Sequence, residues 1–185
     1  MSLLANPVIR DAVLPLTVEQ YRRMGEAGII DERTELIRGV ILHKMNKSPL
    51  HTLTVKRLVD ALLATPLAGF ELRKEEPLTL SQSEPEPDIA IVNENSYEPG
   101  RCHPPSAQLV IEVAISSEMI DREKVSIYAE ADVPEYWLVL PEKRTLERFT
   151  DPRGEAYQNH DVVNFDTAVR TVVPLEIEVD LRRLA

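Results

Sequence analysis

Three stretches of the chain are predicted to be helices. Thr17 is a suitable N-cap for a first helix, which Gly28 ends. A second helix is predicted over 48–64, because it opens with Ser-Pro and its apolar residues recur near helical spacing. A third helix is predicted over 119–131. The sequence therefore predicts three helices that are separated by segments of a different kind.

Stretches of strand-like composition separate these helices. The segment 35–45 predicts a hairpin with Gly39 at its turn. Near-continuous apolarity over 109–115 predicts a strand that is buried on both faces. Further extended segments are predicted over 70–80, 88–92, 136–140, 145–150, 162–165 and 175–179. This order predicts an α/β fold: a mixed central β-sheet flanked by helices, preceded by an N-terminal helix and hairpin.

The remaining segments predict irregular structure. The proline-rich run 83–87 cannot be helical, because each proline restricts the residue before it, so it is an extended approach to Asp88. Residues 93–107 are rich in Asn, Pro and Gly and predict a loop. Residues 1–15 are expected to be a mobile arm ahead of a folded domain over 16–185, with the whole chain, 1–185, forming a single domain.

Composition narrows the possible partners. No stretch approaches the roughly 20 apolar residues of a membrane span, no secretion signal is visible, and Cys102 is a lone cysteine, so a cytoplasmic location is expected. The net charge is −10, from 21 basic and 31 acidic residues, which weighs against a simple nucleic-acid binder. It does not exclude a nuclease, because divalent cations can neutralise a carboxylate-rich site.

Two acidic residues lie in or beside apolar strands. An ionised carboxylate in the apolar stretch around Glu112 needs a salt bridge, a proton or a metal ion. Asp88 begins a second apolar strand, and acids on neighbouring strands can converge on one point. Mg²⁺ prefers such oxygen ligands, and a bound divalent cation promotes phosphodiester hydrolysis. The pair therefore indicates a candidate metal site.

Lys124 lies on an otherwise apolar helix face, at spacings of three, four and seven residues from Ile120, Ile127, Tyr128 and Ala131. One interpretation is a lysine whose ammonium reaches solvent or pairs with Asp121 or Glu123. The other is a functional lysine that stabilises negative charge on a phosphate or orients the attacking water.

Several motifs occur in the order typical of one family: Glu35-Leu-Ile-Arg-Gly-Val, Glu84-Pro-Glu-Pro-Asp-Ile-Ala-Ile-Val, Leu109-Val-Ile-Glu-Val, Asp121-Arg-Glu-Lys and Tyr128-Ala-Glu-Ala-Asp-Val-Pro-Glu-Tyr-Trp-Leu-Val. Over about 15–180 the chain resembles the bacterial "Uma two" family of restriction endonucleases, in the PD-(D/E)xK nuclease superfamily. The resemblance implies a restriction-endonuclease-like core that binds Mg²⁺, with Mn²⁺ as a substitute.

The resemblance also implies roles for individual residues. Asp88 and Glu112 match the two acids of the metal site. The superfamily lysine commonly follows the second acid by two residues, where this chain has Ala114, and Lys124 matches the lysine that the family carries on the next helix. Glu35 matches an acid that joins the metal site directly or through water.

His51 matches a family histidine at the start of the second helix, for which capping or support of a metal ligand is as plausible as catalysis. The chain departs from the family where Ser-Pro often follows the second acid, since it has Ser116-Ser117-Glu118 there. This departure removes none of the expected ligands, but it can change the loop before Lys124.

Other common sites find no support in the sequence. Cys102-His103 lacks a second cysteine at zinc-site spacing, and no glycine-rich phosphate loop is present. The leading hypothesis is therefore a Mg²⁺-dependent endonuclease that acts on DNA, expected to be a homodimer because double-strand cleavage commonly uses two sites. The alternative is a non-catalytic binding or assembly module that keeps the nuclease fold.

Overall fold

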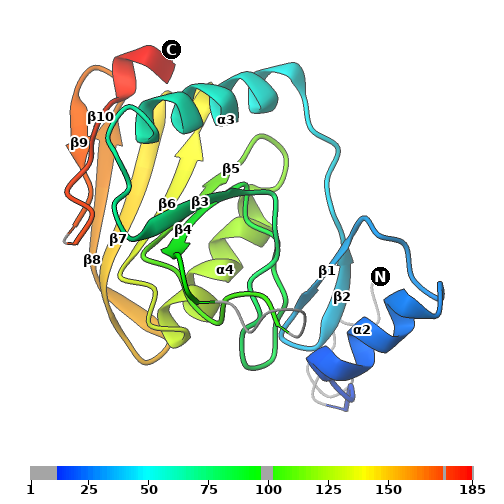
Figure 1. Ribbon diagram of the computed structural model, residues 1–185. Helices are drawn as coiled ribbons and strands as arrows, with labels where there is room; N and C mark the ends of the chain where they lie inside the picture. The colour runs from blue at the N-terminus through cyan, green and yellow to red at the C-terminus, as the bar shows by residue number, and fades with distance from the viewer. Residues whose placement is uncertain (1–11, 97–101, 173, 185) are drawn as a thin grey trace.

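A mixed β-sheet forms the centre of the molecule (Figure 1). The structure is a computed structural model, and it describes residues 12–96, 102–172 and 174–184. Within these residues the sheet has the strand order β3-β4-β5-β6-β7-β8, and β5 and β6 are its one parallel pair. The strands are β3 (Phe70–Lys74), β4 (Ile89–Asn93), β5 (Leu109–Val113), β6 (Glu135–Leu140), β7 (Thr145–Arg153) and β8 (Ala156–Asn164). The predicted mixed sheet is confirmed.

Helices α3 (Pro49–Leu62) and α4 (Glu118–Glu130) pack on opposite faces of this sheet. Successive side chains of a strand point to opposite faces, so β4 and β5 can be apolar throughout and supply both cores. The α3 core contains Val55, Leu58, Ile89, Ile91 and Ile111. The α4 core contains Ala90, Val110, Ile127, Tyr128 and Tyr136. Among the described residues, no helix has the length and apolar character needed to cross a membrane.

The N-terminal helix and hairpin lie beside the sheet (Figure 1). They are α2 (Val18–Glu26), β1 (Thr34–Ile37) and β2 (Val40–His43). Thr17 caps α2 as predicted, and Gln20 completes a reciprocal capping box. Gly39 turns the hairpin with φ +76°, and its carbonyl accepts a hydrogen bond from Leu16 N at 3.0 Å. Of the predicted mobile arm, residues 1–11 lie outside the described residues.

Some strand boundaries differ from those predicted. The strand expected over 70–80 ends at Lys74, because Glu75 has φ +56° and Pro77 has no N–H for a ladder. Strand β8 begins at 156 instead of 162, since its polar sequence pairs with β7 along an edge of the sheet. The tail forms a small pair, β9 (Ala168–Arg170) with β10 (Glu178–Asp180), where one extended segment over 175–179 was expected. Short 3-10 helices η2 (Pro141–Lys143) and η3 (Leu181–Leu184) complete the described elements.

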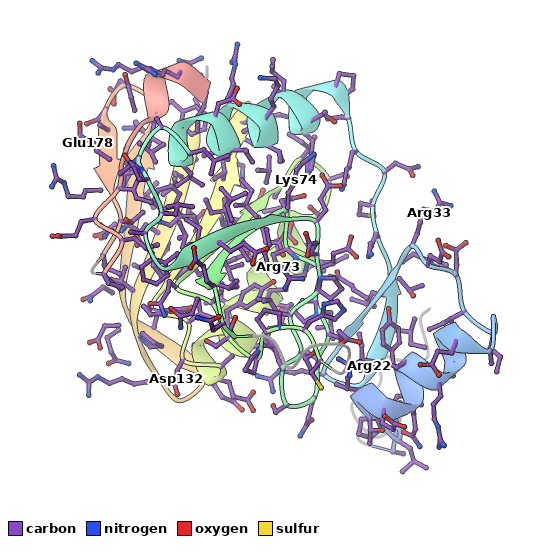
Figure 2. The ribbon with its side chains drawn as sticks, in the orientation of Figure 1. Arg22, Arg33, Arg73, Lys74, Asp132 and Glu178 are labelled. Atoms are coloured by element: carbon purple, nitrogen blue, oxygen red, sulfur yellow. The ribbon has the colours of Figure 1, made fainter. Side chains whose placement is uncertain are left out.

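Arg73 fixes the irregular segment that leads to Asp88. It lies inside the molecule, whereas Arg33 and Glu178 project at its periphery (Figure 2). Its guanidinium is 1% exposed and donates to Pro77 O at 2.8 Å and to Glu76 Oε2 at 2.6 Å. Beyond it, Glu75 N donates to Asp88 O at 3.2 Å. Hydrogen bonds from the buried Arg73 and from Glu75 therefore hold this loop, which precedes the candidate site, in place of a regular strand.

Candidate active site

The start of β4 and the end of β5 bring two acids together. The antiparallel register pairs Ile89 with Ile111, so Asp88, the residue before β4, lies opposite Glu112. Asp88 N donates to Glu112 Oε2 at 3.3 Å, and Val113 N donates to Asp88 Oδ2 at 2.8 Å. The two carboxylates predicted to converge are therefore neighbours, and both are buried.

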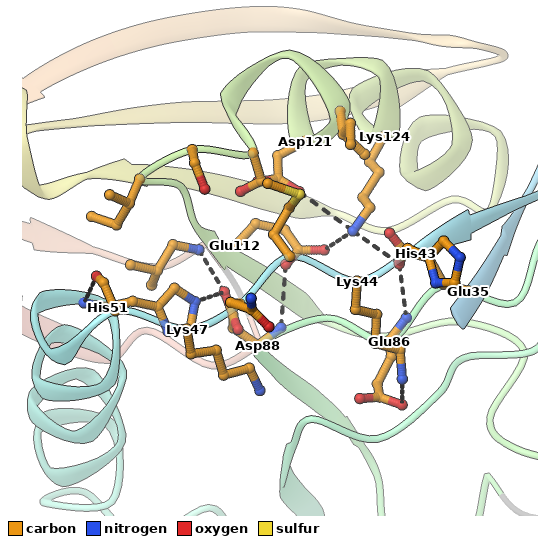
Figure 3. Close-up of a pocket in the computed structure, with 18 residues that line it drawn as sticks. Glu35, His43, Lys44, Lys47, His51, Glu86, Asp88, Glu112, Asp121 and Lys124 are labelled. Atoms are coloured by element: carbon orange, nitrogen blue, oxygen red, sulfur yellow. Dashed lines mark hydrogen bonds and ion pairs between the residues drawn. The ribbon is translucent and has the colours of Figure 1, made fainter. Parts of the chain in front are cut away.

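Lys124 points from α4 into this pair (Figure 3). Its Nζ lies 3.0 Å from Glu112 Oε1, 3.1 Å from Glu35 Oε2 and 3.4 Å from Asp121 Oδ1. The side chain is 5% exposed, so a lysine that reaches solvent is excluded, although the pairing with Asp121 is present. The expected pairing with Asp121 is thus confirmed, and the functional role of Lys124 stays a prediction.

The hairpin and α3 each contribute one residue to the site. Glu35 comes from β1, and besides contacting Lys124 its Oε2 accepts a hydrogen bond from Glu86 N at 3.5 Å. His51 lies in the first turn of α3, with Nε2 3.1 Å from Asp88 Oδ2. The cap of α3 is Ser48, whose Oγ accepts from His51 N at 3.2 Å. A capping role for His51 is therefore wrong, and its ring contacts the candidate ligand Asp88.

Two further residues of the site, Asp121 and Tyr128, were named from the sequence only as neighbours of Lys124 on its helix and not as site residues. Asp121 is buried beside Lys124 and accepts a hydrogen bond from Ser117 Oγ at 2.5 Å. Tyr128 donates its hydroxyl proton to Glu112 Oε1 at 3.1 Å. They lie three residues before and four after Lys124, so the same helical spacing that singled out the lysine would have found both.

An open cavity of about 100 Å³ reaches these side chains. The segment 43–48 lines one part of it, and Ser116, Ser117 and Ile120 line another. At the cavity, Lys44 pairs with Glu86, and Lys47 Nζ lies 2.6 Å from Glu75 Oε2. The carboxylates are thus buried by the protein yet adjacent to space that a small ion or a phosphate group can enter.

The site holds more negative charge than positive charge. Within the described residues, the site has four buried carboxylates, those of Glu35, Asp88, Glu112 and Asp121, and one buried ammonium, that of Lys124, which contacts all of them except Asp88. Burial raises the pKa of Glu112 well above its usual value despite the neighbouring Lys124, and burial likewise raises the pKa of Asp121. Burial opposes the charge of Lys124, but Glu112 and Glu35 outweigh it and raise the lysine pKa. The surplus charge therefore needs protons or a cation.

The donor set fits a hard divalent cation. In the described ranges, no three His, Cys, Asp or Glu side chains are arranged so that together they could hold a metal ion. Mg²⁺ does not require one, because it commonly binds through one or two carboxylates and keeps several waters. Both hydrogen bonds to the Asp88 carboxylate fall on Oδ2, so among the described residues Oδ1 has no donor. Glu112 Oε1 accepts from Lys124 and Tyr128, whereas within the described residues Oε2 accepts one hydrogen bond, from Asp88 N. Asp88 Oδ1 and Glu112 Oε2 can therefore accept such an ion.

Comparisons with known proteins identify the fold and the family of this chain. A crystal structure titled as a putative nuclease belonging to DUF820, from Anabaena variabilis ATCC 29413, is similar with a TM-score of 0.74 at 17% identity. The similarity covers 92% of this chain and 97% of that one, which establishes a shared fold. No curated protein matches the sequence. The family model Uma2, described as "Putative restriction endonuclease", matches residues 18–182. The chain therefore belongs to the Uma2 family.

Proposed function

We propose that this chain is a Mg²⁺-dependent endonuclease that hydrolyses phosphodiester bonds of DNA. The observation that carries the proposal is the group of buried carboxylates around Lys124 at an open cavity. The surplus negative charge of this group favours binding of a divalent cation, and its lysine can stabilise negative charge on a phosphate. Membership of the Uma2 family supports the proposal, as does the fold shared with the Anabaena variabilis protein, which is described as a putative nuclease.

Each residue has a role that follows from its position. Asp88 and Glu112 would hold the cation, and Glu35 would assist through a water instead of as a third direct ligand. When bound, the cation would supply polarisation of the phosphoryl oxygen and a lower pKa for water. Lys124 stabilises negative charge that develops on the phosphate and orients the attacking water. Glu35 and Asp121 hold the lysine ammonium, at 3.1 and 3.4 Å, so that it stays in the site.

The experiment is cleavage of supercoiled plasmid by the purified protein in Mg²⁺, in Mn²⁺ and in EDTA. The wild type should nick the plasmid in either metal but not in EDTA, and Asp88→Asn should lose at least ~100-fold in rate, on the order of losing one catalytic electrostatic contact. The matched control is Glu123→Gln, because Glu123 is an exposed acid next to Lys124. Undiminished cleavage by the Asp88→Asn protein would contradict the proposed site.

A non-catalytic binding module is the second candidate, and the net charge of −10 favours it. Such a module would cleave nothing in any metal and would bind no Mg²⁺.

A nuclease that makes double-strand breaks is expected to act as a homodimer, and light scattering that gives the mass of two chains would support that expectation.

A further inference from the structure

His51 is a buried histidine whose backbone and ring have separate partners. It is the third residue of α3, and its backbone N–H donates a hydrogen bond to Oγ of the N-cap residue Ser48. Its side chain is 11% exposed and extends to the end of the sheet, where Nε2 lies 3.1 Å from Asp88 Oδ2 (Figure 3). The ring thus joins the first turn of a helix on one face of the sheet to the residue that precedes β4.

Among the described residues, hydrogen-bond partners hold the Asp88 carboxylate on one oxygen, Oδ2, and leave Oδ1 without a donor. Oδ2 accepts from Val113 N at 2.8 Å and contacts the His51 ring at 3.1 Å. Within the described chain no donor reaches Oδ1, and Asp88 lines the cavity. Because both contacts fall on Oδ2, they fix the rotation of the carboxylate and leave Oδ1 available to a ligand.

The hydrogen-bond partners of the two ring nitrogens indicate why this position holds a histidine. Oδ2 accepts a hydrogen bond from Val113 N and therefore faces the ring as an acceptor, so the ring donates to it from Nε2. Nδ1 is buried and has no hydrogen-bond partner in the described part of the chain. Native proteins rarely leave a buried nitrogen unsatisfied, so packing alone would favour an apolar side chain here. The contact with Asp88 is what the imidazole contributes.

We infer that His51 is a positioning residue that locks the Asp88 carboxylate with Oδ1 directed to a divalent cation. This inference rests on the proposed function and extends it. Groups that hydrogen-bond to metal ligands commonly change metal affinity by 10–100-fold when removed. Removal of the Nε2 donor should therefore weaken Mg²⁺ and Mn²⁺ binding by roughly that factor.

The test is titration of Mg²⁺ and Mn²⁺ into the wild-type protein and three variants by calorimetry. His51→Asn removes the donor, because its amide corresponds to the Nδ1 position of the ring. His51→Gln places an amide nitrogen near the Nε2 position and should bind within a few-fold of the wild type. The matched control is Thr54→Val, which alters a buried polar residue one turn further along α3 whose hydroxyl donates to Leu50 O.

The outcomes are distinct. Weaker binding by His51→Asn, with near-normal binding by His51→Gln and Thr54→Val, supports the inference. Equal affinity of His51→Asn and the wild type overturns it and leaves the proposed function standing. If the wild type binds neither metal, the proposed function fails as well.

A second measurement does not depend on the folding of any variant. Long-range ¹H–¹⁵N correlation spectra of the wild type should show His51 with its proton on Nε2, and its ring signals should shift when Mg²⁺ is added. A proton on Nδ1, or signals that do not respond to Mg²⁺, would contradict the positioning role.

Discussion

Lys124 is surrounded by more negative charge than its one positive charge compensates. Its ammonium contacts Glu35, Glu112 and Asp121, all buried. Buried charges are costly unless paired, so the lysine stabilises the carboxylates as much as they stabilise it. The residue therefore links stability to function: it would face the phosphate in a nuclease, and it compensates part of the negative charge of the acids when no metal is bound.

Replacing this lysine should destabilise the metal-free protein. Lys124→Met removes the partner of several buried carboxylates, and breaking a buried ion pair commonly costs about 3–5 kcal/mol. Urea denaturation in EDTA should show a loss of this size, and added Mg²⁺ should restore part of it. Lys143→Met is the control, since Lys143 is exposed beside Glu118 and its loss should cost under about 1 kcal/mol. Equal stability of the two variants would contradict the charge balance described here.

Individual residues of the site were predictable to different degrees. Asp88 and Glu112 stand out because acids in or beside apolar strands need a reason, and Lys124 because it interrupts an apolar helix face. The contact between Glu35 and Lys124 was not predictable from periodicity, because it joins a hairpin to a helix some 90 residues later along the chain. Such long-range contacts depend on how the elements pack.

At the scale of elements, the β1–β2 hairpin carries Glu35 and depends on a tight turn. Gly39 has φ +76°, and a Cβ at this position would lie 2.4 Å from the Cβ of Pro15. The segment before α2 is therefore packed against the turn of the hairpin. A side chain at position 39 must disturb this contact and the strand that presents the acid.

Gly39→Ala should destabilise the protein more than Gly69→Ala does. Both glycines have positive φ, which costs an alanine about 1–2 kcal/mol, but nothing lies within 4 Å of a Cβ at Gly69. The clash with Pro15 should add roughly 1–3 kcal/mol, the usual cost of overpacking. Chemical denaturation of both variants measures the difference, and equal losses would show that the hairpin turn is not tightly packed.

Element prediction succeeded where local chemistry is decisive. The Thr17 capping box and the Ser48-Pro49 start fix helix boundaries within a few residues of sequence. The prediction missed the first half of β8, because most of its side chains are exposed and show no apolar alternation, and the strand forms by pairing with β7. It also failed at the end of β3, where the positive φ of Glu75 depends on contacts with the Asp88 segment.

At the scale of the whole molecule, a charged network joins α4 to the far strands of the sheet. Glu147 of β7 accepts from Arg122 of α4 at 2.8 Å and lies 3.0 Å from Nε2 of His160 on β8. Arg122 lowers the pKa of Glu147 below its ordinary value of 4.5. The folded protein therefore binds a proton at this position less readily than the unfolded chain does.

This network should make stability depend on pH in acid. The stabilisation from Glu147 is complete above pH 4.5 and is lost as the pH falls through the lower pKa of the folded state. Glu147→Gln should thus lower the free energy of unfolding by roughly 1 kcal/mol at pH 7, and the difference from the wild type should shrink in more acidic solution. Urea denaturation from pH 7 to pH 3 measures it, and a difference that is constant with pH would contradict this role.

The most direct measurement for the site as a whole is calorimetric titration of Mg²⁺ into the wild type, Glu112→Gln and Glu123→Gln. If the carboxylates of Asp88 and Glu112 hold a divalent cation, the wild type and Glu123→Gln bind one Mg²⁺ per chain with equal affinity, and Glu112→Gln binds at least ~10-fold more weakly. Equal binding by all three proteins, or no binding by the wild type, would contradict a metal site at the junction of β4 and β5.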